Sequence, residues 1–430
     1  MRINALTIPQ KGHLGTIDYV NSTIASLGAY DVWTQDFPAV TGKVSKSRLV
    51  LDGKVPKSAE PMQLTPPTSN KETVSGPIVP VAGFGCDKGD YPSSLTGAIA
   101  FISRGTCPFG TKSELAGQAG AIGAVIYNNE KGPFGGTLGV PSSDHVPSFG
   151  ISDADAAPYL EKLGQGGLVS ASAFIDAEVK VITTTNVIAQ TVDGDPENCV
   201  MLGGHSDSVE AGPGINDDGS GSLSLIEVAT QLVKFRVNNC VRFAWWAAEE
   251  EGLLGSAYYV DVLPAEENKK IRLFMDMDML AGPNFANQIY NGTNDENPEG
   301  STEIRDLYVD FYESQGLNYT FIAFDGRSDY DAFIKGGIPG GGIATGAEVI
   351  KTPEEQAMFG GEAGIPFDPC YHQLCDGVGN VNLTVWEVST KVCQVLKKKK
   401  KKRKKRRGLI LTFVYAIVGC AFGCHLCYFA

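Results

Sequence analysis

Residues 199–218 read CVMLGGHSDSVEAGPGINDD, and this stretch decides the fold. Its apolar start, at 200–202, predicts a short buried strand, so His205 and Asp207 follow the carboxyl end of that strand. Open α/β sheets place their ligands at this end of their strands. The stretch therefore predicts an α/β enzyme whose chemistry lies at one edge of a sheet.

The second half of the stretch predicts a turn followed by a helix. The residues at 212–214, Gly-Pro-Gly, turn the chain, and the polar residues at 216–218 are suited to cap a helix. The apolar positions that follow have a helical period: Leu223, Ile226, Thr230 and Val233. One short segment thus directs an imidazole and several carboxylates toward a single place.

Further along the chain, strand-like and helix-like segments alternate from residue 184 to a last amphipathic helix at 385–395. Alternation of this kind specifies a mostly parallel central sheet with helices on both faces. A predicted helix at 17–27 followed by a predicted strand at 31–37 continues the same alternation at the start of the chain. The fold class predicted for this part of the chain is therefore α/β.

Between residues 44 and 177 the pattern changes to short strands that are separated by many glycines and prolines. We interpret this segment as a β-rich domain inserted into the α/β domain. The predicted boundaries are 1–43 and 180–396 for the discontinuous α/β domain and 44–179 for the insert.

The 430-residue chain is too long for one ordinary core, and its charge is unevenly distributed. Eleven of the 36 basic residues form the run 397–407; without them, 25 basic residues face 49 acidic ones, a net charge of −24. So acidic a body argues against nucleic-acid binding. The apolar segment 408–430 is just long enough to span a bilayer, so a membrane anchor is one reading; we expect 397–430 to be no part of the working protein.

Four Asn-X-Ser/Thr sequons favour an oxidising, secretory environment: Asn21, Asn291, Asn318 and Asn382. The N-terminal residues MRINALTIPQ lack the apolar core of a signal peptide. We expect a secreted glycoprotein whose recorded start lies downstream of the true one; a cytosolic protein is the alternative.

None of the ten cysteines lies in a repeated CxxC array of the kind that holds structural zinc. Cys86 and Cys107 flank one predicted strand of the insert and are expected to pair. Cys199 and Cys240 each precede a buried strand, so they either bond, if those strands are neighbours, or remain free buried thiols.

Carboxylates recur at predicted strand ends between two of the five histidines. The residues concerned are His205, Asp217, Glu249, Glu250, Asp278 and His372. Each has an ordinary structural explanation alone, because a histidine can be a buried hydrogen-bonding residue and an acid can cap a helix. Together at one sheet edge, the acids would repel one another without a cation such as zinc, which accepts nitrogen and oxygen ligands.

Six motifs carry a family resemblance: HSDSV at 205–209, GINDDGSGS at 214–222, FAWWAAEEEGLLGS at 243–256, FMDMDML at 274–280, GRSDY at 326–330 and DPCYHQLCD at 368–376. With these motifs, in this order, the chain resembles the co-catalytic dinuclear zinc aminopeptidases. The resemblance is to the branch of the secreted fungal leucine aminopeptidases and aminopeptidase Y. The insert resembles the protease-associated (PA) domain of that branch, and the main domain is expected to have the zinc peptidase fold.

The resemblance implies two zinc ions per chain. His205 and Asp278 would hold one ion, Glu250 and His372 would hold the other, and Asp217 would bridge them.

The resemblance also implies catalytic roles. Glu249 would act as general base on a water that bridges the two zinc ions, and would return the proton to the leaving amine. Asp207 would orient the imidazole of His205. Tyr371 would stabilise the oxyanion.

A disulfide between Cys370 and Cys375 is expected, by resemblance, to hold the loop of Tyr371. Arg327 would lie near the amino end of the substrate. The implied activity is removal of N-terminal residues, preferably leucine or other hydrophobic ones, from peptides with a free N-terminus, by a monomer. The alternatives are an inactive receptor on the same scaffold and a carboxypeptidase, for which Arg327 is the obvious cationic group.

Overall fold

The structure is a computed structural model that describes residues 11–132 and 134–393. Its contacts divide the chain into unit 1, residues 1–37 and 183–430, and unit 2, residues 38–182. The chain passes between the units within β1 (Tyr30–Leu51) and β7 (Ser170–Thr191). The predicted domain boundaries fall in these same two strands, and their positions stay a prediction. The basic run and the apolar tail lie outside the described residues.

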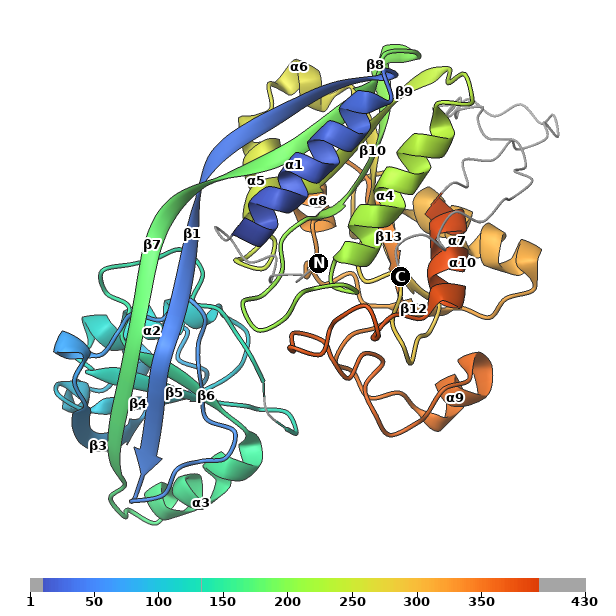
Figure 1. The fold of residues 1–430 in the computed structure, drawn as a ribbon. Helices are drawn as coiled ribbons and strands as arrows, with labels where there is room; N and C mark the ends of the chain where they lie inside the picture. The colour runs from blue at the N-terminus through green and yellow to red at the C-terminus, as the bar shows by residue number, and fades with distance from the viewer. Residues whose placement is uncertain (1–10, 133, 394–430) are drawn as a thin grey trace. The chain divides into compact units, whose positions relative to one another are not determined.

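Unit 1 is built on a mostly parallel sheet (Figure 1). Besides β1 and β7 it contains β8 (Asp195–His205), β9 (Asn239–Trp246), β10 (Ile271–Met277), β11 (Gln288–Tyr290), β12 (Thr320–Ile322) and β13 (Gly340–Ala344). The order is β12-β11-β13-β10-β8-β9-β7. The central pairs β10–β13, β10–β8 and β8–β9 are parallel, whereas β7 and β11 join antiparallel to their inner neighbours. The predicted fold class is confirmed.

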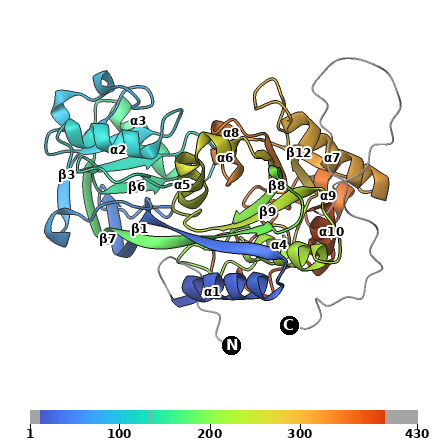
Figure 2. The same cartoon turned by 90° about the horizontal axis from the view of Figure 1, so that it is seen from above.

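Helices cover both faces of this sheet. The helices of unit 1 are α1 (Lys11–Ser26), α4 (Gly219–Leu232), α5 (Leu254–Val262), α6 (Ala265–Asn268), α7 (Ser301–Gln315), α8 (Tyr330–Lys335), α9 (Pro353–Phe359) and α10 (Leu383–Cys393), of which α6 and α9 bury no residue. Residues of α1, α4, α7 and α10 share one buried cluster with β-strand side chains, and residues of α5 and α8 share another. Figure 2 shows α1 and α5 on opposite sides of the strands.

The alternation within β8 fits a sheet that is buried on both faces. Val200 and Leu202 face the α1 and α4 side, and Met201 faces the α5 and α8 side. A disulfide joins Cys199 to Cys240, at the amino ends of β8 and β9, because these strands are neighbours.

The buried face of α4 differs from the predicted one. Leu223 and Val233 are each 41% exposed, whereas Leu225, Ala229 and Leu232 are buried. Ile226 is buried as predicted, but the predicted face was wrong at Leu223 and Val233 because three serines, at 220, 222 and 224, occupy buried positions and donate their hydroxyls to backbone carbonyls. Hydrogen bonding let polar side chains occupy positions that a hydrophobic pattern reserves for apolar ones.

Unit 2 has its own sheet and two cores. Its elements beyond the long strands include β2 (Glu60–Pro61), β3 (Val74–Pro80), β4 (Ile99–Ser103), β5 (Gly123–Tyr127), β6 (Ser148–Ile151), α2 (Phe109–Gln118) and α3 (Asp153–Gly164). The order is β7-β3-β4-β5-β6-β2, with β3 to β6 parallel. The helix α2 packs in one core and α3 in the other, and neither helix was predicted. A disulfide joins Cys86 to Cys107.

Within the described residues, no helix combines the length and the apolar character that crossing a membrane requires.

Candidate metal centre

The predicted ligands lie at the carboxyl ends of three adjacent parallel strands and on one long loop. His205 is the last residue of β8, Glu249 and Glu250 follow β9, and Asp278 directly follows β10. Parallel strands end at the same edge of a sheet, so their continuations converge there. His372 comes to this edge on the loop between β13 and α10.

Asp217 lies between the two histidines. Its Oδ1 is 3.1 Å from Nε2 of His205, and its Oδ2 is 3.1 Å from Nε2 of His372. Nε2 of His372 is also 3.0 Å from Oε2 of Glu250. Oδ1 of Asp278 is 3.6 Å from Nε2 of His205. The two predicted pairs are therefore together, with one carboxylate placed between them.

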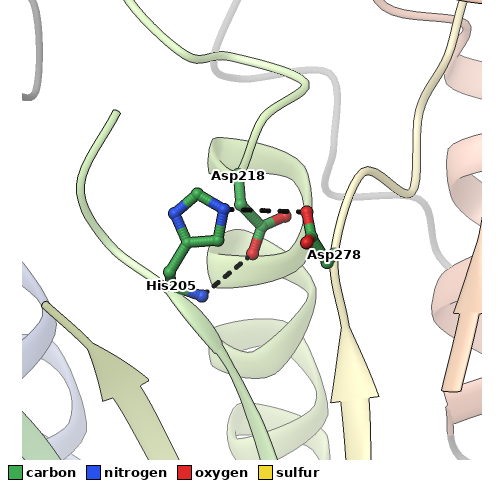
Figure 3. A group of neighbouring side chains, drawn as sticks. All are labelled: His205, Asp218 and Asp278. Atoms are coloured by element: carbon green, nitrogen blue, oxygen red, sulfur yellow. Dashed lines mark hydrogen bonds and ion pairs between the residues drawn. The ribbon is translucent and has the colours of Figure 1, made fainter. Parts of the chain in front are cut away.

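Asp218 also lies within reach of His205 and Asp278, as Figure 3 shows. Its carboxylate, however, accepts three hydrogen bonds from backbone N–H groups: Oδ2 accepts that of His205, and Oδ1 accepts those of Gly221 and Met279. It is the N-cap of α4. Asp217, whose two oxygens face two imidazoles, is better placed to bridge two ions.

The donor set fits a pair of divalent cations. Four carboxylates surround two imidazoles: Asp217, Glu249, Glu250 and Asp278. Oε1 of Glu250 and Oδ1 of Asp278 are buried, and no described group lies within hydrogen-bonding distance of either oxygen. Buried carboxylate oxygens without donors are costly unless a cation compensates them.

The electrostatics of the residues report the same excess of negative charge. Burial disfavours a charged His372, yet Glu250 and Asp217 raise the pKa of His372 to about 10. Burial also acts against the charged form of His205, but Glu249, Asp217 and Asp278 hold its pKa well above the usual value. Burial, and then the charge of Asp217, raises the pKa of Glu250 to about 7.

Asp207 lies beside the imidazole of His205, with its backbone carbonyl oxygen closer to the ring than its carboxylate is. Nδ1 of His205 is 3.0 Å from the backbone carbonyl oxygen of Asp207 and 3.8 Å from its carboxylate. The two carboxylate oxygens accept the backbone N–H groups of Glu249 and Glu250, at 3.2 and 3.3 Å. Asp207 thus links the end of β8 to the two glutamates that follow β9.

Tyr371 and Arg327 lie at the border of the cluster. The ring of Tyr371 stacks on that of His372, with centroids 3.8 Å apart, and a disulfide joins Cys370 to Cys375. Burial raises the pKa of Tyr371 well above its usual value, so its hydroxyl keeps its proton. Arg327 pairs with Glu348 at 3.0 Å.

Two residues that contact the cluster or its immediate neighbours were not identified from the sequence. Ser328 donates its hydroxyl to Oδ2 of Asp278 at 2.8 Å. His13 of α1, which is 1% exposed, has its Nε2 3.1 Å from Oγ of Ser206. Because Ser206 donates its own proton to the carbonyl of Trp246, His13 must be the donor. No motif includes His13. Its place on the buried face of an amphipathic helix was the one feature of the sequence that indicated a hydrogen-bond partner.

Known proteins match both units. The family model "Peptidase family M28" matches residues 186–396, and the PA domain model matches residues 74–159. Aminopeptidase Y of Saccharomyces cerevisiae is 45% identical over 396 residues, 90% of this chain and 72% of that protein. Leucine aminopeptidase 2 of Trichophyton equinum is 46% identical over 375 residues, 86% and 74% of the two chains.

A solved structure extends the match to the fold. An aminopeptidase from Aneurinibacillus sp. strain AM-1 superposes with a TM-score of 0.74 at 27% identity, covering 90% of this chain and 88% of that one. A zinc aminopeptidase from Bacillus subtilis shares the fold, with a TM-score of 0.64 at 24% identity. The family resemblance and the expectation of an enzyme are confirmed: the chain belongs to peptidase family M28 and carries a PA domain.

Proposed function

We propose that this chain is a zinc aminopeptidase that binds two metal ions and removes N-terminal residues, preferably leucine or other hydrophobic ones, from peptides. One observation carries the proposal: the two oxygens of Asp217 face the imidazoles of His205 and His372 at equal distances. The names of the 45–46% identical relatives, aminopeptidase Y and leucine aminopeptidase 2, support the activity and the leucine preference.

The proposed ligands follow from the donor atoms. His205 and Asp278 would hold one ion, Glu250 and His372 the other, and Asp217 would contact both. When bound, zinc lowers the pKa of a coordinated water to about 7 and acts as a Lewis acid. Two imidazoles with carboxylates form a nitrogen and oxygen donor set of the type that zinc accepts.

Glu249 is the proposed general base. Its Oε2 is 3.9 Å from Nε2 of His205, so it borders the cluster, and the N–H that anchors it donates to Asp207. Burial raises the pKa of Glu249 well above its usual value, which suits a group that accepts and then returns a proton. The protonated hydroxyl of Tyr371 is a donor for the oxyanion.

The charges around the cluster favour an aminopeptidase over a carboxypeptidase. A carboxypeptidase needs an uncompensated cation for the terminal carboxylate, but Glu348 pairs with Arg327. The surrounding carboxylates instead attract the α-ammonium group of a free N-terminus. An inactive receptor is disfavoured because all the proposed ligands and the base are present.

Space for the side chain of the first residue is available beside Tyr371. A cavity of about 550 Å³ there is lined in part by Pro366, Pro369 and Leu374. We assign this cavity to the substrate because the same loop carries His372.

Secretion is part of the proposal and rests on separate observations. Three disulfides are present, and Asn291 and Asn318 of the sequons are exposed. Disulfides and glycans both form on the secretory route. A shift in electrophoretic mobility after glycosidase treatment of the native protein would support this route.

Replacement of the base tests the mechanism. In Glu249→Gln, turnover of leucyl-4-nitroanilide should fall by about 10²- to 10⁴-fold, because the general base is lost, while bound zinc is retained. The matched control is Glu251→Gln in the same acidic run, which should keep most of the activity. Mass spectrometry of the metals and steady-state kinetics provide the measurements; full activity in Glu249→Gln would refute the assignment.

The substrate class is tested with the N-terminus free or blocked. The proposal expects hydrolysis of leucyl-4-nitroanilide and none of its N-acetyl derivative. Cleavage of both, or of neither, would count against an aminopeptidase.

A further inference from the structure

A second cavity, of about 410 Å³, lies in unit 1 apart from the metal cluster. It is formed by side chains of β1, β7, β9 and the segment from α5 to α6. These elements are labelled in Figures 1 and 2. Its central residue, Arg242, precedes Trp246 by four positions on β9, which at about 3.3 Å per residue places it roughly 13 Å from the catalytic end of the strand. The cavity is therefore separate from the proposed active site.

Arg242 is only 6% exposed, and its guanidinium is partly satisfied by neutral groups. Nε and Nη2 donate to Oε1 of Gln190 at 3.1 and 2.7 Å, and Nη1 donates to the hydroxyl of Tyr259 at 2.7 Å. A guanidinium has five N–H groups. Two of them thus have no hydrogen-bond acceptor among residues 11–132 and 134–393.

The charge of Arg242 has one carboxylate partner, at long range and shared with a lysine. The nearest paired oxygen, of Glu267, is 3.9 Å from Nη2, and Glu267 already binds Lys270 at 2.7 Å. The aromatic face of Trp33 lies 5.8 Å from the guanidinium carbon. Glu267 therefore compensates the charge of Arg242 only in part, and the fork-shaped donors of an arginine match a carboxylate in a bidentate manner.

The rest of the cavity is suited to an apolar group. Trp33 is 38% exposed and Val262 is 48% exposed, and Leu263 also lines the space. Asp31 at the same cavity offers an acceptor for a ligand ammonium group. The cavity thus combines two guanidinium N–H groups without an acceptor in the described part of the chain, apolar walls and two acidic groups, Asp31 and Glu267.

We propose that this cavity binds a small organic carboxylate with an apolar side chain, its carboxylate on Arg242 and its apolar part on Trp33 and Val262. Free amino acids and simple branched carboxylic acids share this chemistry. The proposal does not depend on the peptidase activity.

Trp33 provides the probe for the test. The chain has four tryptophans, and the other three, Trp245, Trp246 and Trp386, are at most 7% exposed. We expect leucine and 4-methylpentanoate, added to the zinc-loaded enzyme, to change tryptophan emission saturably, and 4-methylpentanamide, which lacks both the carboxylate and the α-amino group of an aminopeptidase substrate, to have no such effect. Trp33→Phe should remove the response.

Variants at the exposed Val262 avoid the risk of unfolding. Val262→Glu should weaken carboxylate binding by about tenfold through repulsion, and Val262→Lys should strengthen it. Val181→Glu, at a residue of unit 2 that is 69% exposed, is the matched control and should bind as wild type does. Turnover without added carboxylate should stay within about twofold in all three variants.

The possible results separate clearly. Binding of leucine alone would support the proposal with a free amino acid as ligand, and binding of both acids would support it for simple carboxylic acids as well. The proposal is overturned if neither acid changes the emission, if 4-methylpentanamide binds as tightly as 4-methylpentanoate, or if Val262→Glu and Val262→Lys bind like wild type. Loss of turnover in Glu249→Gln has no bearing on these results.

Discussion

At the residue scale, Asp217 and Asp218 show how neighbouring identical side chains acquire different tasks. Both are buried, but Asp217 faces two imidazoles, whereas Asp218 accepts three backbone N–H groups. A carboxylate whose oxygens are occupied by amide donors has little capacity left for a cation. The two residues therefore differ in the role we propose for each: Asp217 as a metal ligand and Asp218 as a support of the backbone.

Paired substitutions distinguish these tasks. Asp217→Asn should lose metal, and with it nearly all turnover, because the bridging charge is removed. Asp218→Asn should lower the free energy of unfolding by about 1–3 kcal/mol, because one backbone donor is left unsatisfied, but should keep its zinc. Metal analysis and urea unfolding measure both effects. Metal loss in Asp218→Asn alone would reverse the assignment.

His13 gives a pH dependence with a defined sign. Burial lowers the pKa of His13, with Asp207 acting against this and His205 adding to it, so the folded state prefers the neutral ring. Below pH 6.5 the unfolded chain binds the proton first, and stability falls as the pH falls, by at most about 1.4 kcal/mol per unit. His13→Gln should therefore lose less stability than wild type between pH 6.5 and 5. Parallel urea titrations of the two proteins measure this difference; identical slopes would contradict it.

At the scale of elements, the site depends on where strands end, and disulfides hold different ends. Cys199–Cys240 joins the amino ends of β8 and β9, at the edge of the sheet away from the metal cluster. Cys370–Cys375 closes a short loop that contains Tyr371 and His372. The Cys199–Cys240 bond should therefore contribute mainly to the stability of the sheet, and the Cys370–Cys375 bond should mainly hold Tyr371 and His372 in position.

Removing each disulfide tests this difference. Cys199→Ala with Cys240→Ala opens a separation of 41 residues and should cost about 3–4 kcal/mol of stability, with kcat/KM within about twofold. Cys370→Ala with Cys375→Ala opens a separation of 5 residues and should cost about 2 kcal/mol, but lower kcat/KM by about tenfold or more. Thermal unfolding and kinetics check the pair. Equal losses of kcat/KM would disprove the distinction.

At the scale of the whole molecule, the excess of acids at the proposed metal site should make the stability of unit 1 depend on bound cations. Four carboxylates gather around two imidazoles in unit 1, and unit 2 contains no comparable group of metal-binding side chains among its described residues. A ligand that binds only the folded state stabilises it in proportion to the logarithm of its concentration.

Metal removal should therefore act on one unit. The native protein should contain about two zinc ions per chain. Chelation should abolish turnover and lower the melting temperature of unit 1. Free zinc, added back at about 100 times its Kd, should raise the free energy of unfolding of unit 1 by about 2.7 kcal/mol. Calorimetry with metal analysis is the measurement, and the transition of unit 2 is the internal control. A melting curve unchanged by chelation would argue against a bound metal pair.

The sequence by itself determined the alternation of strands and helices, the position of His205 at a strand end and the motifs that point to family M28. These features are local, since apolar periodicity and turn-forming residues act over a few positions. Local patterns also led to errors. Leu223 and Val233 of α4 were wrongly assigned to the buried face, where hydrogen-bonded serines lie instead, and the glycine-rich pattern of unit 2 concealed α2 and α3.

Only the tertiary structure decided which atoms meet. The contact between His13 and Ser206 spans 193 positions, the backbone carbonyl oxygen of Asp207 lies closer to the ring of His205 than its carboxylate does, and Arg242 lies in a cavity that no motif marks. Such contacts depend on how whole elements pack against one another, because packing sets the distances between side chains that the chain itself leaves far apart.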